Sequence, residues 1–75
     1  AVARAVAENQ RLHSFHDLRV EDSRSGKRRV MFDVILNEAL CDREIKRVVA
    51  DIKARLKPEL PDTAIAVKAE QPYIS

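Results

Sequence analysis

The stretch that decides the fold is Arg29-Val30-Met31-Phe32-Asp33-Val34-Ile35-Leu36, residues 29–36. Every second residue in it is apolar in the same phase, namely Val30, Phe32, Val34 and Leu36. A period of two is typical of a β-strand, because successive side chains point to opposite faces of a sheet. We therefore predict a strand over residues 28–37 that buries this face.

The segment before this strand has the same period. In residues 15–22 (FHDLRVED), Leu18 and Val20 are predicted to point one way, while charged residues between them point the other. The link, residues 23–27 (SRSGK), holds the only glycine of the chain and is the best candidate for a tight turn. Two neighbouring strands with a short polar link predict an antiparallel hairpin.

A helix and a third strand follow. Residues 41–57 carry one apolar stripe at helical spacing: Ile45, Val48, Val49, Ile52 and Leu56. Pro58 lacks a backbone N–H and is expected to end the helix near Lys57. Residues 63–70 alternate again, with Ile65 and Val67 predicted to face inward. A helical crossover permits this last strand to lie parallel to the second.

The termini complete the pattern. Residues 1–12 are rich in helix formers and predict a first helix, while residues 71–75 read as a tail. The predicted order is α-β-β-α-β. The fold class is therefore α+β, a ferredoxin-like open-faced sandwich with a three-stranded sheet.

The composition narrows the class of protein. Seventy-five residues allow one domain, and a chain this short has limited stability alone, so a partner subunit or a metal is expected. One cysteine excludes an internal disulfide framework. Fourteen basic and twelve acidic residues give a net charge of +2, which is weak support for nucleic-acid binding. No apolar run approaches the ~20 residues of a membrane span. Because the chain starts without Met inside a helical pattern, we expect a fragment of a longer protein.

The two histidines are the candidate metal ligands. His13 and His16 are three residues apart, but the predicted change from helix to strand separates them. His16 would need acidic partners, with Asp17, Glu21 and Glu70 as candidates. The alternative is that His16 is only a polar residue at the start of a strand.

Other chemistry has less support. Cys41 stands where the long helix needs an N-cap, and no second cysteine or histidine accompanies it, so a structural role is favoured over a redox one. The basic residues around the turn, Arg24, Lys27, Arg28 and Arg29, lack the exposed aromatic residues that stack on RNA bases. A phosphate-binding glycine loop is excluded by the single glycine, and no catalytic triad motif is present. We predict neither an enzyme nor a nucleic-acid-binding protein.

The second face of the sheet is unexpectedly apolar. Met31 and Ile35 point away from the face that the helices should cover, and Ala66 and Lys68 of the third strand share their side. Exposed apolar residues on an open sheet often mark a contact surface. We predict a dimer interface formed by Met31, Ile35, Ala66 and Lys68.

With these residues identified, the chain resembles the cytoplasmic C-terminal domain of the cation diffusion facilitator family, membrane transporters that export divalent cations such as zinc. The family pattern is close to V-H-D-L-R-V, a turn with S-G, R-V-F-V-D-L-H, a Ser-capped helix and V-T-V-H-V-E-P. The matching segments are residues 15–20 (FHDLRV), 25–26 (SG), 29–34 (RVMFDV) and 65–70 (IAVKAE). The resemblance covers essentially the whole chain.

The resemblance implies a regulatory, homodimerising domain, residues 1–75, on the cytoplasmic face of the cell (inner) membrane, attached to a membrane-spanning domain of the same chain. It implies metal ligands at His16 and Glu70, and the spacing of the two histidines adds His13 as a further candidate. Ile35, Lys46 and Lys68 stand where family members often have histidine, and none of them is a normal ligand at neutral pH. We therefore expect a reduced site that binds Zn²⁺ or another divalent cation weakly. The alternative is a stand-alone ferredoxin-like small-molecule sensor or protein-interaction module.

Overall fold

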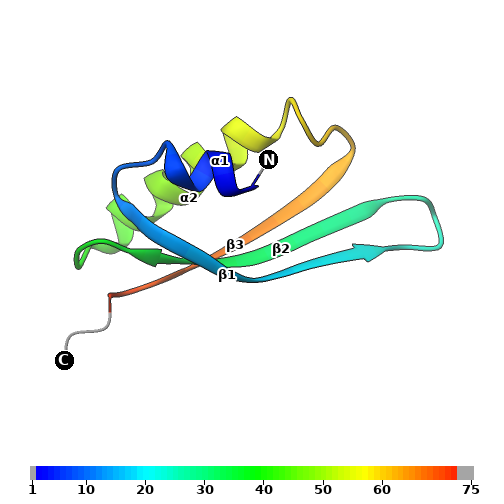
Figure 1. The fold of residues 1–75 in the computed structure, drawn as a ribbon. Coiled ribbons are helices and arrows are strands. Elements are labelled where there is room, and N and C mark those ends of the chain that lie inside the picture. Colours follow the sequence, from blue (N-terminus) through cyan, green and yellow to red (C-terminus); the bar gives the residue numbers. More distant parts are fainter. Residues whose placement is uncertain (1, 73–75) are drawn as a thin grey trace.

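The computed structural model describes residues 2–72 as a three-stranded sheet with two helices on one face (Figure 1). The elements are α1 (Val2–Ala7), β1 (Leu12–Asp22), β2 (Arg28–Leu36), α2 (Asp42–Leu56) and β3 (Thr63–Glu70). This is the predicted α-β-β-α-β order of a ferredoxin-like α+β fold. Of the predicted tail, residues 73–75 lie outside the described part of the chain.

The sheet has the order β1-β2-β3, with β2 at its centre. β1 pairs with β2 antiparallel, as the predicted hairpin requires, and β3 pairs with β2 in parallel. The α2 segment makes the crossover between the two parallel strands, and its bounds agree with the prediction to within one residue at each end. Both predicted strand pairings are confirmed.

The core lies between the helices and one face of the sheet. On β2, burial alternates as the sequence predicts, and Val34 and Leu36 have no exposed surface. From α2, Ile52 and Leu56 are equally inaccessible. Phe32 packs edge-to-face against Phe15 with ring centroids 6.3 Å apart. The outer residues of β2 are covered by neither helix, so within residues 2–72 the second face of the sheet is open (Figure 1).

The first helix is shorter than predicted. It ends at Ala7, and β1 already begins at Leu12. The reason is a turn at Asn9, whose side-chain oxygen accepts a hydrogen bond from the Arg11 amide at 2.9 Å and whose carbonyl accepts one from the Leu12 amide at 3.1 Å. Asparagine favours such turns over a continuing helix. His13 therefore belongs to a strand.

β1 contains a bulge that the sequence pattern does not reveal. The register to β2 shifts by one residue between His16 and Arg19, and Asp17 adopts a positive φ of 56°. Leu18 and Val20 were predicted to form the buried face of this strand, but they are 47 % and 56 % exposed. The reason is that this half of the hairpin extends beyond the two helices, so neither α1 nor α2 covers it (Figure 1).

The hairpin turn lies where it was predicted. The Ser23 amide donates to the Lys27 carbonyl at 2.9 Å, and Gly26 takes φ = 81°. Because a positive φ is strained for residues with a Cβ atom, the single glycine of the chain is placed where the turn requires it.

Candidate metal centre

Three side chains with metal-binding atoms meet on the open face of the sheet. They are His16 of β1, Asp33 of β2 and Glu70 of β3, and one ligand atom from each lies within 4.8 Å of the others. His16 and Asp33 are direct partners in the antiparallel ladder. Glu70 pairs with Ile35, two residues along β2 from Asp33, and therefore points to the same face. All three residues are partly buried.

The imidazole of His16 is held from both sides. Its Nε2 lies 3.2 Å from the Glu70 carboxylate, and its Nδ1 lies 3.1 Å from the carboxylate of Asp17. The hydrogen bond to Glu70, followed by the contacts with Asp17, raises the pKa of His16 above its ordinary value of 6.5. The bulge contributes directly to this arrangement, since Asp17 is one of the two residues at the register shift.

This geometry fits a divalent cation. A histidine that ligates a metal usually donates its other ring N–H to a carboxylate, which fixes its tautomer and orientation. Here Asp17 is placed to accept that hydrogen bond, and Nε2 lies beside the Glu70 carboxylate. One ligand atom of Asp33 lies within 4.8 Å of those of His16 and Glu70. One imidazole and two carboxylates form a donor set suited to Zn²⁺ and similar divalent ions.

The structure separates the predicted ligands. His16 and Glu70 are brought together, as the predicted set requires. His13 is exposed near the start of β1 and does not belong to the cluster. Glu21 pairs with Arg29 in the outer part of the hairpin. Asp33 was missed as a candidate ligand, although the antiparallel pairing places it opposite His16 once the register is known.

The residues predicted for a dimer interface border this centre. Met31, Ile35 and Ala66 are partly buried and Lys68 is exposed, and their strand positions place all four on the open face. Lys68 is the ladder partner of Asp33, so its position brings a positive charge beside the cluster. Lys46, in contrast, belongs to α2 and therefore to the layer that covers the opposite face.

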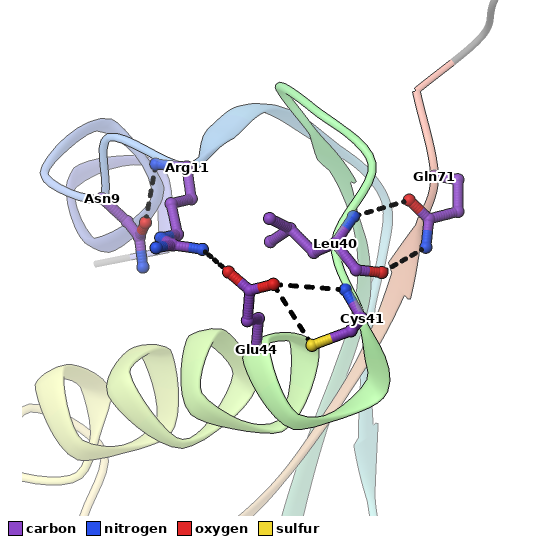
Figure 2. A network of polar contacts seen from close by, with 6 residues as sticks. All are labelled: Asn9, Arg11, Leu40, Cys41, Glu44 and Gln71. Carbon is purple, nitrogen blue, oxygen red and sulfur yellow. Dashed lines mark hydrogen bonds and ion pairs between the residues drawn. The ribbon is translucent and has the colours of Figure 1, made fainter.

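A second polar network lies at the start of α2 (Figure 2). Cys41 is the N-cap, as predicted, and its thiol donates to Glu44 at 3.2 Å. Arg11 donates to the same carboxylate group at 2.7 Å. These bonds, first from Arg11 and then from Cys41, lower the pKa of Glu44. The thiol thus takes part in a structural network.

The basic turn is ordinary hairpin surface. Arg28 donates to Asp22 across the hairpin at 3.0 Å, and Phe32, the aromatic residue of β2, is buried in the core. Among residues 2–72, no helix is long and apolar enough to cross a membrane.

Comparisons with known proteins identify the fold. Neither the protein-family models nor the curated proteins give a match to this chain. Among solved structures, the metal-bound C-terminal domain of the CzcD transporter from Cuprividus metallidurans is 25 % identical, with a TM-score of 0.73 over 92 % of both chains. CzrB, a proposed zinc transporter, is 15 % identical, with a TM-score of 0.79 over 96 % of this chain and 89 % of that one. The chain thus has the structure of the C-terminal domain of cation diffusion facilitator transporters, the family that its sequence resembles.

Proposed function

We infer that residues 1–75 form the cytoplasmic C-terminal domain of a divalent metal cation efflux transporter, and that this domain binds its cation through His16, Asp33 and Glu70. The observation that carries the proposal is the convergence of these three side chains from three different strands. Each strand contributes one donor atom, and Asp17 orients the histidine. The likeness to a metal-bound transporter domain supports the same assignment.

The proposed role is regulatory and not catalytic. The open face of the sheet carries both the cation cluster and the apolar residues Met31 and Ile35, so a second copy packed on this face would lie against the cation. A cation held beside such an interface neutralises carboxylates that would otherwise face those of the partner copy. We propose that the domain forms a homodimer through this face and that cation binding tightens it.

Calorimetric titration with Zn²⁺ tests the binding site. The wild-type domain is expected to bind one ion per chain weakly, because three protein ligands are fewer than the four of a closed structural site and Lys68 adds a positive charge. His16→Ala and Asp33→Asn should each abolish measurable binding. His13→Ala is the matched control and should bind as the wild type does. Binding that survives His16→Ala but is lost in His13→Ala would refute the assignment.

Sedimentation equilibrium tests the dimer. The wild-type domain is expected to be dimeric at high micromolar concentration, with a smaller dissociation constant in the presence of Zn²⁺. Ile35→Lys should shift it to monomer, because a charge would replace an apolar side chain at the centre of the proposed interface. Val20→Lys places the same charge on the exposed outer part of the hairpin and serves as the control. A wild-type domain that stays monomeric under all these conditions would refute homodimerisation, but it would leave the cation site untouched.

A further inference from the structure

Of the three side chains in the cluster, Glu70 stands at the end of its strand, where the backbone is least restrained. It is the last residue of β3, and its pairing with Ile35 is the last pair of the parallel ladder. His16 lies on β1, two strands away, a distance of about 10 Å between strand axes. The ends of strands open more readily than their centres. The carboxylate of Glu70 therefore keeps its place beside His16 only if something holds the end of β3.

The next residue, Gln71, supplies that restraint. Its side-chain oxygen accepts a hydrogen bond from the Leu40 amide at 3.3 Å, and its side-chain nitrogen donates to the Leu40 carbonyl at 3.1 Å. Figure 2 shows both bonds reaching the backbone of this one residue. These two hydrogen bonds fasten the residue that follows β3 to the segment between β2 and α2.

Leu40, whose backbone bonds the Gln71 side chain, is itself held by packing and by neighbouring hydrogen bonds. The Leu40 side chain is 9 % exposed and belongs to the core. The following residue, Cys41, caps α2, and its backbone amide and thiol both reach the carboxylate of Glu44. Glu44 in turn accepts from Arg11, which stands one residue before β1. One network therefore joins the end of β3 to the start of β1, the strand that carries His16 (Figure 2).

We propose that Gln71 is a positioning residue of the cation centre. It does not touch the cation, and it holds the end of β3 so that the Glu70 carboxylate faces His16 Nε2. This proposal rests on the proposed cation binding by His16, Asp33 and Glu70. Residues that orient metal ligands contribute strongly to affinity, and their loss typically weakens binding by 10- to 100-fold. For Gln71, which acts through the backbone, we expect the lower end, about tenfold.

The experiment compares Gln71→Met with Gln10→Met. Methionine has a similar length and cannot form the two hydrogen bonds, and Gln10 is an exposed glutamine at the opposite end of the sequence. Zn²⁺ affinity is measured by calorimetry, and ligand geometry is followed by the visible absorption spectrum of bound Co²⁺. Gln71→Met should weaken Zn²⁺ binding about tenfold and change the Co²⁺ spectrum. Gln10→Met should do neither. Equal affinities and equal spectra in the two variants would overturn the proposal, even if Gln71→Met melts at a lower temperature.

Amide hydrogen exchange of the metal-free protein gives a second readout. Gln71→Met should accelerate exchange at Leu40 and in residues 68–70, while Gln10→Met leaves both unchanged. Unchanged exchange in residues 68–70 would overturn the idea that Gln71 orders the end of β3. A wild-type protein that binds no Zn²⁺ would instead refute the proposed function, and the exchange data would still decide the structural part of the inference.

Discussion

Protonation of His16 should control cation affinity, and the side chains of the cluster indicate how many protons are released when a cation binds. The cluster contains one imidazole and two carboxylates. Of the side-chain types in the cluster, histidine is the one that ordinarily titrates between about pH 5.5 and 8. Its Nδ1 faces Asp17 and keeps its proton, while Nε2 must lose one to bind a cation. Binding should therefore release one proton below the pKa of His16 and none well above it.

The expected size of the effect follows from this count. The pKa of His16 is raised above 6.5, so from pH 5.5 to 6.5 the Zn²⁺ affinity should increase by about tenfold. The stability of the metal-free fold changes with pH in the opposite direction. A raised pKa in the folded state stabilises the fold below the unfolded value of about 6.5, and this contribution is lost as the pH rises through the pKa of the folded state. Metal-free stability should fall over the range in which Zn²⁺ affinity rises.

Calorimetry in buffers of different ionisation enthalpy measures the proton count directly. About one proton per Zn²⁺ is expected at pH 5.5, with a count near zero at pH 8.5. His13→Asn should keep this profile, because His13 lies outside the cluster. Release of two protons, or a profile that His13→Asn abolishes, would refute the assignment of a single histidine ligand.

Three further predictions concern stability. Ile52→Ala, at a side chain with 0 % exposure, should lower the free energy of unfolding by about 3 kcal/mol in urea denaturation, and a loss below about 1 kcal/mol would contradict the packing. Gly26→Ala should cost about 1 kcal/mol, because nothing lies within 4 Å of a new Cβ and the strain of φ = 81° is the whole penalty. Cys41→Ser should raise the free energy of unfolding by about 0.5 kcal/mol, because serine is the better N-cap. A lower melting temperature for this variant would show that the thiol–Glu44 contact is the stronger cap.

The secondary-structure elements that could be predicted are those whose sequence pattern lies within a single short segment. The alternation in residues 29–36 defined β2 and its buried face, and the stripe that includes Ile52 defined α2. Pro58 marked the end of that helix. Each of these signals is contained within a dozen residues, so no knowledge of the partner strand was needed.

What could not be predicted depends on pairing between distant segments. The bulge at Asp17 requires a positive φ in a residue that is not glycine, and no periodicity signals it. Because the bulge shifts the register, the positions opposite β1 cannot be counted from the turn alone. Asp33 was therefore not recognised as the neighbour of His16. The Asn9 turn was missed for a similar reason, since helix propensity outweighed it in a window of helix formers.

The three donor residues stand on all three strands of the sheet, and this has a consequence for the whole domain. A single ion shared by His16, Asp33 and Glu70 would fasten both edge strands to the central one, as a cross-link does. Because only the folded chain assembles this set, an ion at one hundred times its dissociation constant would add about 2.7 kcal/mol to the stability of the fold. The melting temperature of the domain would then report the concentration of free cation around it.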